Sequence, residues 1–336
     1  MSSEMTLPSP HETGKLKIKQ LKRFWYATLL NRDNNINTGL QEEWQLNKIL
    51  LGTLNLGLEQ AIIYIYQNTL SFEALEDWIV KTAGIPDSGS VERFNRMFDG
   101  EEAETESVSP VLSAEDLLFF EINGYVVIKN AVPKEDCEEA INVICDFLGI
   151  KSDRPDTWYQ PNIARQGIMV QLFQHPILTK NRGSDKIRGA FEQLWQKKNI
   201  WMNNDRVGFN PPETTSWKFP GPDLHWDCSL ELPIPFGLQG ILYLSDTAAN
   251  QGAFTLVPGF QHRLESWLKS LPPGADPRQQ NLHTLGSKPI TGEAGDFIIW
   301  QQALQHGSSP NTSTQPRFVQ YICYQPVDYT EHTNWR

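Results

Sequence analysis

The segment 222–232, with the sequence PDLHWDCSLEL, places His225 and Asp227 two residues apart. Its apolar residues, flanked by Pro and Gly, favour a short strand. Because residues i and i+2 of a strand point to the same face, we expect the imidazole and the carboxylate to project together. Such a pair can supply two ligands of a two-histidine, one-carboxylate iron(II) site. One such pair also arises readily by chance, so the interpretation depends on a third ligand.

A third ligand is available downstream, in GDFIIWQQALQHGSSPNTSTQPRFVQY. His306 follows a predicted strand, and Arg317 opens another strand eleven residues later. A guanidinium binds a carboxylate through two parallel hydrogen bonds, so Arg317 could hold a dicarboxylate cosubstrate such as 2-oxoglutarate near the metal. The hydroxyl of Ser308 could donate to the same carboxylate.

This order of residues, H-x-D followed by a long gap, a histidine and then an arginine, resembles the phytanoyl-CoA dioxygenase family of iron(II)/2-oxoglutarate-dependent oxygenases. The resemblance covers roughly residues 114–326. It includes the segments FEINGYVVIKNAVPKEDCEEA, GLQGILYLSDTAANQGAFTLVPGFQHR and the closing segment that contains His306 and Arg317. One departure is the turn at 258–262, PGFQH in place of Pro-Gly-Ser-His, so no role is assigned to His262.

The resemblance implies an α+β fold in which a double-stranded β-helix, or jelly roll, carries flanking helices and holds the metal at its open mouth. The catalytic metal ligands it implies are His225, Asp227 and His306. Arg317 matches the residue that anchors the C5-carboxylate of 2-oxoglutarate, with Ser308 beside it. Tyr243 and Asn204 lie where related enzymes place an aromatic ring and an amide next to the cosubstrate.

The implied reaction uses iron(II), dioxygen and 2-oxoglutarate, and hydroxylates or desaturates an unactivated C–H bond of a small organic substrate while 2-oxoglutarate is decarboxylated to succinate. Related halogenases replace the carboxylate ligand with a small residue, so the presence of Asp227 favours hydroxylation or desaturation over halogenation. The alternative is a non-catalytic jelly-roll module that binds a metal or a small ligand. Iron-dependent release of succinate distinguishes the two.

The chain is expected to contain a helical N-terminal region (1–98), an acidic linker (99–112) and the jelly-roll domain (113–336). Ser71 and Gly84 are predicted to bound one N-terminal helix. Five carboxylates and no basic residue fall within 99–111, which is typical of a solvated tether. Ser113 and Asp116 form a predicted capping box at the start of the second domain. After residue 201 short strands alternate with Pro and Gly, as in a sandwich or barrel.

The composition restricts the partners. A formal net charge of −11 argues against nucleic acid or an anionic membrane as the main partner. Four cysteines without CxxC spacing fit a reducing compartment. The polar N-terminus has no apolar segment typical of a secretion signal, and the apolar stretch 49–66 is interrupted by polar residues, so we expect a buried helix and a cytoplasmic protein.

The N-terminal region is rich in aromatic residues for its length. These residues suggested more apolar surface than the region could bury by itself. We therefore expect it to pack on the oxygenase domain or on a second subunit, with a homodimer as one outcome; the residues concerned are Phe24, Trp25, Trp44, Trp78 and Phe94.

Overall fold

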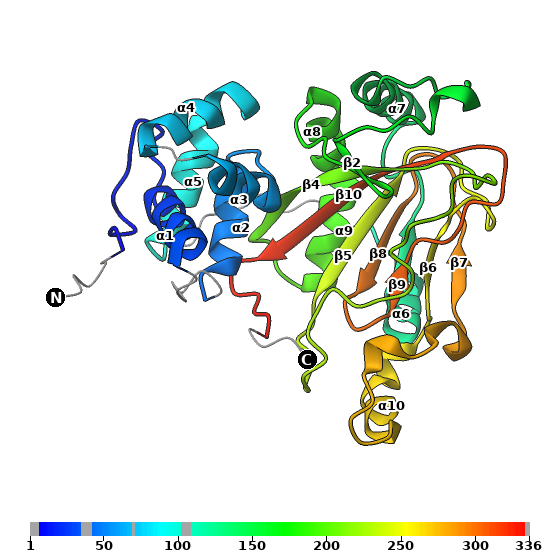
Figure 1. The fold of residues 1–336 in the computed structure, drawn as a ribbon. Coiled ribbons are helices and arrows are strands. Elements are labelled where there is room, and N and C mark those ends of the chain that lie inside the picture. The colour runs from blue at the N-terminus through cyan, green and yellow to red at the C-terminus, as the bar shows by residue number, and fades with distance from the viewer. Residues whose placement is uncertain (1–6, 35–41, 69–70, 102–108, 333–336) are drawn as a thin grey trace. The chain divides into compact units, whose positions relative to one another are not determined.

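A computed structural model describes residues 7–34, 42–68, 71–101 and 109–332 (Figure 1). The chain divides into two compact units, which are considered separately. The first contains residues 1–106 together with 198–205 and 326–329, and the second contains 107–197, 206–325 and 330–336. The division falls inside the acidic segment that was predicted to be a linker, of which residues 102–108 lie outside the described residues. The return of two later segments to the first unit was not predicted.

The first unit is built from helices. Ser71 caps α4 by accepting a hydrogen bond from the Ala74 amide, and Gly84 ends the helix, as predicted. The helices described here are α1 (Leu21–Asn34), α2 (Trp44–Thr53), α3 (Leu58–Gln67), α4 (Phe72–Ala83) and α5 (Ser88–Phe98).

The apolar stretch 49–66 is two helices, and the expectation of one buried helix is wrong. The chain breaks after Thr53, and α2 and α3 meet at 94°. No single helix in the described ranges has the length and apolar character needed to cross a membrane, and this bent pair meets those criteria only when its two helices are counted together.

The first unit buries several of its aromatic side chains in its own core. Phe24 and Phe94 are 1% and 0% exposed, and both belong to one apolar cluster. Trp201 joins that cluster from the segment 198–205, and its ring meets Phe94 edge to face with ring centroids 6.4 Å apart. Part of the cover of Phe94 thus comes from a residue outside 1–98, in the range predicted to belong to the jelly-roll domain; the expected packing of the N-terminal region on a further surface stays a prediction.

The second unit contains a seven-stranded sheet. It includes the last part of β4, which pairs with β3 through Val207 and Gly208. The strand order is β1-β8-β5-β10-β4-β3-β2. The strands are β1 (Tyr125–Ile128), β2 (Arg165–Gln166), β3 (Met169–Val170), β4 (Ile200–Asn210), β5 (Leu238–Tyr243), β8 (Phe297–Gln301) and β10 (Arg317–Pro326).

A smaller sheet faces the first across the core, as Figure 1 shows. Its order is β7-β6-β9, from β7 (Lys288–Ile290), β6 (Phe254–Leu256) and β9 (His306–Gly307). Side chains from both sheets form one apolar cluster, which includes Ile241, Phe254, Ile298, Trp300 and Val319. Two facing sheets with antiparallel pairing are the jelly-roll arrangement, which confirms the predicted fold class.

Side-chain alternation along β10 separates the core from the helical layer. Val319 points into the core between the sheets, whereas Gln320 points outward and donates to the Leu178 carbonyl at 2.8 Å. Leu178 lies on α8 (Pro176–Arg182), and Phe191 of α9 (Asp185–Trp195) packs on Phe297 of β8. These two helices therefore cover the outer face of the large sheet.

The remaining helices of the second unit are α6 (Ala114–Asn123), α7 (Lys134–Leu148) and α10 (Leu264–Ser270). Ser113 and Asp116 form the predicted capping box of α6. Short 3₁₀ turns lie at Pro155–Thr157, Phe260–His262, Pro277–Gln279 and Leu282–Leu285.

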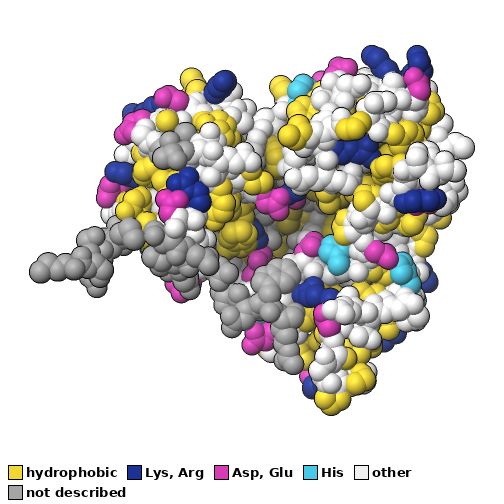
Figure 2. Space-filling model, viewed as in Figure 1, with side chains coloured by type: hydrophobic (Ala, Val, Ile, Leu, Met, Phe, Trp, Pro, Cys, Tyr) yellow, Lys and Arg dark blue, Asp and Glu magenta, His cyan; other side chains and the backbone are white. Residues whose placement is uncertain are grey.

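On the face shown in Figure 2, basic and acidic side chains are interspersed.

Candidate metal and cosubstrate site

His225 and His306 are brought together by the backbone. The amide of each donates to the carbonyl of the other, at 2.9 and 3.0 Å, in an isolated antiparallel bridge. The predicted strand at 225–232 is reduced to this one bridging residue, because the chain turns away after His225. Asp227 therefore lies in a bend and not on a strand. The expectation that His225 and Asp227 share one face of a strand is wrong, although their side chains do lie together.

The three predicted ligands converge. The Nε2 atoms of His225 and His306 lie 3.2 Å from Oδ1 and Oδ2 of Asp227, respectively. One ligand atom from each residue lies within 4.8 Å of those of the other two. His306 is 4% exposed, whereas the Asp227 side chain is 51% exposed, so the group is open on the carboxylate side.

Both imidazoles have their orientation fixed by a backbone carbonyl. His225 Nδ1 donates to the Asp223 carbonyl at 2.6 Å, and His306 Nδ1 donates to the Leu304 carbonyl at 3.1 Å. A hydrogen on Nδ1 leaves the lone pair of Nε2 for a metal ion. The donor set of two imidazole nitrogens and a carboxylate oxygen suits iron(II).

The opposite charges of the aspartate and the histidines shift the pKa values of Asp227 and His225. Burial by itself would raise the pKa of Asp227, but when the imidazoles of His225 and His306 are protonated, their hydrogen bonds and positive charges outweigh burial and hold that pKa well below its usual range. For His225, burial lowers the pKa and the neighbouring carboxylate raises it by more, so its pKa lies above the ordinary value. The carboxylate is therefore ionised and ready to bind a cation.

The bend that carries Asp227 is held by residues from other segments. Arg278 donates to the carbonyls of Trp226 and Cys228, at 2.8 and 2.7 Å, and these are the two neighbours of Asp227 in the chain. The indole of Trp226 donates to the Ala303 carbonyl at 3.0 Å. Gln239 Nε2 donates to Asp227 Oδ2 at 2.8 Å.

Gly307, between a metal ligand and Ser308, allows the segment before His225 to lie directly against β9. A Cβ atom at this position would lie 2.4 Å from the carbonyl oxygen of Asp223. Only glycine permits this approach of the two backbones without a shift. The carboxylate of Asp223 in turn accepts a hydrogen bond from His283 Nε2 at 2.8 Å.

Arg317 is buried with an incomplete set of partners. The side chain is 0% exposed, and its Nη2 donates to Ser308 Oγ at 2.9 Å. Its Nε and Nη1 are also buried and have no hydrogen-bond partner among the residues that the structure describes. A buried guanidinium without an anion is unfavourable, so this arrangement fits a carboxylate ligand that would complete it.

Ser308 connects the arginine to the metal ligands. It lies two residues after His306, which in an extended chain corresponds to about 6.6 Å. That separation is comparable to the length of a five-carbon dicarboxylate, one end of which would reach the metal while the other meets Arg317.

Tyr243 is part of the core between the sheets and is fully buried. Its hydroxyl donates to the Ile290 carbonyl at 2.6 Å and accepts from the Phe254 amide at 2.9 Å. Burial raises its pKa to about 12, so the phenol stays neutral. The positive charge of Arg317 lowers this pKa, against the effect of burial. Tyr243 of β5 is paired with Val319 of β10, and Arg317 lies two residues before Val319 on the same face of that strand. A neutral ring beside the arginine is compatible with the predicted place next to the cosubstrate.

Asn204 belongs to the first unit, unlike the other predicted site residues. Its amide nitrogen donates to the Asn55 carbonyl at 2.6 Å. This bond gives Asn204 a structural contact within the first unit, and its place beside the cosubstrate stays a prediction.

Three polar residues that contact the site were missed in the sequence. Gln239, Arg278 and His283 each reach the metal-binding segment from a distant part of the chain. Gln239 shares the inward face of a predicted strand with Ile241 and Tyr243. A polar residue on that face is the one sequence signal that could have identified it.

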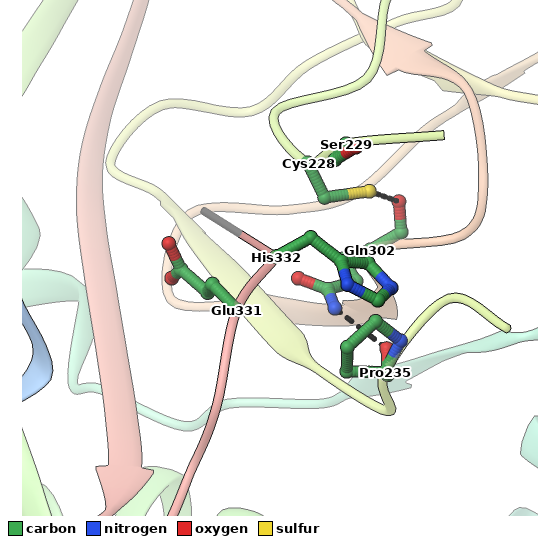
Figure 3. Close-up of a pocket in the computed structure, with 6 residues that line it drawn as sticks. All are labelled: Cys228, Ser229, Pro235, Gln302, Glu331 and His332. Carbon is green, nitrogen blue, oxygen red and sulfur yellow. Dashed lines mark hydrogen bonds between the residues drawn. The ribbon is translucent and has the colours of Figure 1, made fainter. Parts of the chain in front are cut away.

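A small pocket lies behind the metal-binding bend and contains no metal ligand (Figure 3). The thiol of Cys228 points toward the Gln302 carbonyl at 3.4 Å, and Gln302 Nε2 donates to the Pro235 carbonyl at 2.6 Å. The pocket is lined by Cys228, Ser229, Pro235, Gln302, Glu331 and His332. Cys228 thus lines this pocket and belongs to the apolar cluster of the second unit.

The fold and the ligand set define a jelly-roll protein with a two-histidine, one-carboxylate site. The family model described as phytanoyl-CoA dioxygenase matches residues 120–319, which is more than half of the chain. The chain therefore belongs to the phytanoyl-CoA dioxygenase family. This membership confirms the family predicted from the sequence, and it identifies the chain as an enzyme of the iron(II)/2-oxoglutarate-dependent oxygenase class.

Individual proteins are similar to this chain at low identity. A Dictyostelium discoideum protein named "Putative phytanoyl-CoA dioxygenase" is 26% identical over 260 residues, covering 62% of this chain and 74% of that protein. The ectoine dioxygenase of Bordetella bronchiseptica is 22% identical over 247 residues, covering 65% and 77%. The crystal structure of EctD from S. alaskensis with bound Fe has 17% identity and a TM-score of 0.48, covering 69% of this chain and 86% of that one.

Proposed function

We propose that this protein hydroxylates or desaturates an unactivated C–H bond of a small organic substrate, using iron(II), dioxygen and 2-oxoglutarate and releasing succinate. The single observation that carries the proposal is the fully buried Arg317 guanidinium, whose Nε and Nη1 lack partners among the described residues. Its Nη2 bonds to Ser308, two residues after His306, which suits a dicarboxylate bound between the arginine and a metal.

Each residue of the site has a task in this proposal. His225, Asp227 and His306 would hold iron(II) through two Nε2 atoms and one carboxylate oxygen. When bound, iron(II) supplies the position at which dioxygen is activated as 2-oxoglutarate is decarboxylated.

The cosubstrate end of the site follows the same logic. Arg317 and Ser308 would bind the distal carboxylate of 2-oxoglutarate, with a charge-assisted contact from the guanidinium. Tyr243 would form a neutral wall beside it, because its hydroxyl is already committed to Ile290 and Phe254. Tyr243 is therefore proposed to lie next to the cosubstrate. Asn204 is proposed as a second neighbour of the cosubstrate, although its amide already bonds to the Asn55 carbonyl.

The relatives named above are called phytanoyl-CoA and ectoine dioxygenases, whose names denote small organic molecules of different chemistry. The proposal for this chain is accordingly a small organic substrate, without a narrower class. The non-catalytic alternative, a module that only binds a metal or ligand, could also use the donors of Arg317, so turnover of 2-oxoglutarate separates the two.

The test is the conversion of 2-oxoglutarate to succinate by the purified full-length protein, with iron(II) and dioxygen supplied. Succinate should form only when both are present, and the Asp227→Ala variant should form none. A wild-type protein that binds iron(II) and 2-oxoglutarate but never forms succinate, with a broad set of candidate substrates present, would establish the non-catalytic alternative.

A further inference from the structure

Asp227 is the metal ligand that the backbone holds least. His225 and His306 are fixed by their mutual bridge, whereas Asp227 lies in the bend that follows it. Its side chain is 51% exposed. The position of the carboxylate therefore depends on side chains that reach it from elsewhere.

Gln239 makes the contact that orients the carboxylate group itself. Its Nε2 donates to Asp227 Oδ2 at 2.8 Å, and its Oε1 accepts from the indole Nε1 of Trp300 at 3.0 Å. Gln239 and Trp300 are direct partners in the pairing of β5 with β8, so the backbone register fixes this contact. Trp300 is 3% exposed and packs against Phe254, with ring centroids 4.3 Å apart.

The indole also determines which end of the Gln239 amide faces the carboxylate. Because an indole nitrogen only donates, the oxygen of Gln239 must face Trp300 and the NH₂ group must face Asp227. The buried Trp300 thus fixes the Gln239 amide so that its NH₂ group donates to Oδ2 of Asp227.

A carboxylate can bind a metal through one oxygen or through both. Binding through both would fill a coordination position that this type of site leaves open for the cosubstrate and dioxygen. A hydrogen bond to Oδ2 makes that oxygen a poorer metal ligand and leaves Oδ1 for the metal. We propose that Gln239 is a positioning residue that, together with Trp300, restricts Asp227 to a single metal bond. This inference rests on the proposed metal site.

The experiment replaces Gln239 with methionine, which has a similar length and lacks the amide. The matched control is Gln320→Met, which removes a buried glutamine amide that bonds to Leu178 on the outer face of the same sheet. The absorption spectrum of the cobalt(II)-substituted protein reports coordination, and calorimetric titration with nickel(II) alone gives the affinity. Neither measurement requires turnover.

The Gln239→Met protein should show a changed cobalt(II) spectrum and about 10- to 100-fold weaker nickel(II) binding, the usual cost of losing a partner of a metal ligand. Gln320→Met should match the wild type in both. If Gln239→Met does not fold, Gln239→Asn serves instead, because its shorter amide cannot reach Asp227 and Trp300 together, and it should give the same changes.

A wild-type cobalt(II) spectrum in the variant, or an equal change in Gln320→Met, would overturn the role of Gln239. A wild-type protein that binds neither cobalt(II) nor nickel(II) would instead refute the proposed metal site, so the two failures are distinguishable.

Discussion

Arg317 Nη2 donates to Ser308 Oγ at 2.9 Å inside the jelly roll, and two further nitrogens of the same guanidinium have no partner among the described residues. The Ser308 hydroxyl therefore orients the Arg317 guanidinium, whose main partner would be the carboxylate of a bound cosubstrate. This relationship separates the roles of the two residues, since Ser308 aligns the group and Arg317 supplies the charge.

Replacing Ser308 with alanine should raise the KM for 2-oxoglutarate about 2- to 10-fold, because one hydrogen bond contributes about 0.5–1.5 kcal/mol. Metal affinity should stay as in the wild type. Ser309→Ala is the matched control, since the Ser309 hydroxyl donates to the Ala253 carbonyl and not to the arginine. Steady-state kinetics of succinate formation measures both; equal KM values for the two variants would remove Ser308 from the cosubstrate site.

Replacing His306 with alanine should abolish tight iron(II) binding and leave the fold in place, because the bridge to His225 uses only backbone atoms. Calorimetric titration of iron(II) without oxygen gives the affinity, and thermal unfolding checks the fold. His262→Ala should bind iron(II) as the wild type does, since His262 donates to the Glu121 carbonyl outside the site. Undiminished affinity in His306→Ala would contradict the ligand assignment.

Gly307→Ala should weaken metal binding without touching a ligand. The new Cβ would lie 2.4 Å from the Asp223 carbonyl oxygen and push the segment that carries His225 away from β9. Such overpacking costs about 1–3 kcal/mol of the free energy of unfolding. Gly183→Ala is the control, because the nearest atoms to its Cβ are 3.5 Å away. Denaturant unfolding and metal titration of both variants test this; equal results for the two would show that the close approach is unimportant.

The cysteines should differ sharply in reactivity. Burial raises the pKa of Cys137 and Cys228 to about 12, from 9.0, and that of Cys145 to about 11. A raised pKa lowers the thiolate fraction, so at pH 8 these thiols should react with a disulfide reagent far more slowly than in the unfolded chain. Cys323, which is only partly buried, should react first.

The same shifts predict how stability depends on pH. A group whose folded pKa is raised contributes stability that is complete below its unfolded pKa and is lost as the pH rises through the folded value. The free energy of unfolding should therefore fall as the pH rises above about 9. Rapid labelling of Cys137, Cys145 and Cys228 in the folded protein at pH 8 would contradict their burial.

The sequence was sufficient to propose the three ligand candidates that the structure brings together and the arginine proposed to bind the cosubstrate, because their types and order are local features of three short segments. It was misleading about the shape of one of them. Alternation predicted a strand through Asp227, but the described strand pairing of this segment is limited to the bridge at His225, and the carbonyls of Trp226 and Cys228 accept hydrogen bonds from Arg278. A hydrogen bond between residues about 50 positions apart leaves no local pattern.

The same limit explains the other differences. The contact of Gln239 with Asp227 depends on how β5 sits beside the bend, and a single chain read in order does not reveal this pairing. The break between α2 and α3 follows Gly52, whose Cβ would lie 2.2 Å from the Met202 carbonyl, so a long-range contact shapes that helix end. Where structure depends on partners distant in the chain, propensity and periodicity do not determine it.

Binding of 2-oxoglutarate by Arg317 is tested most directly by calorimetric titration of 2-oxoglutarate into the nickel(II)-loaded protein. The wild type should bind, and Arg317→Leu should bind at least about tenfold more weakly, since a charge-assisted contact contributes about 1.5–3 kcal/mol. Nickel(II) affinity should be the same in both. Equal 2-oxoglutarate affinities in the wild type and in Arg317→Leu would contradict the account.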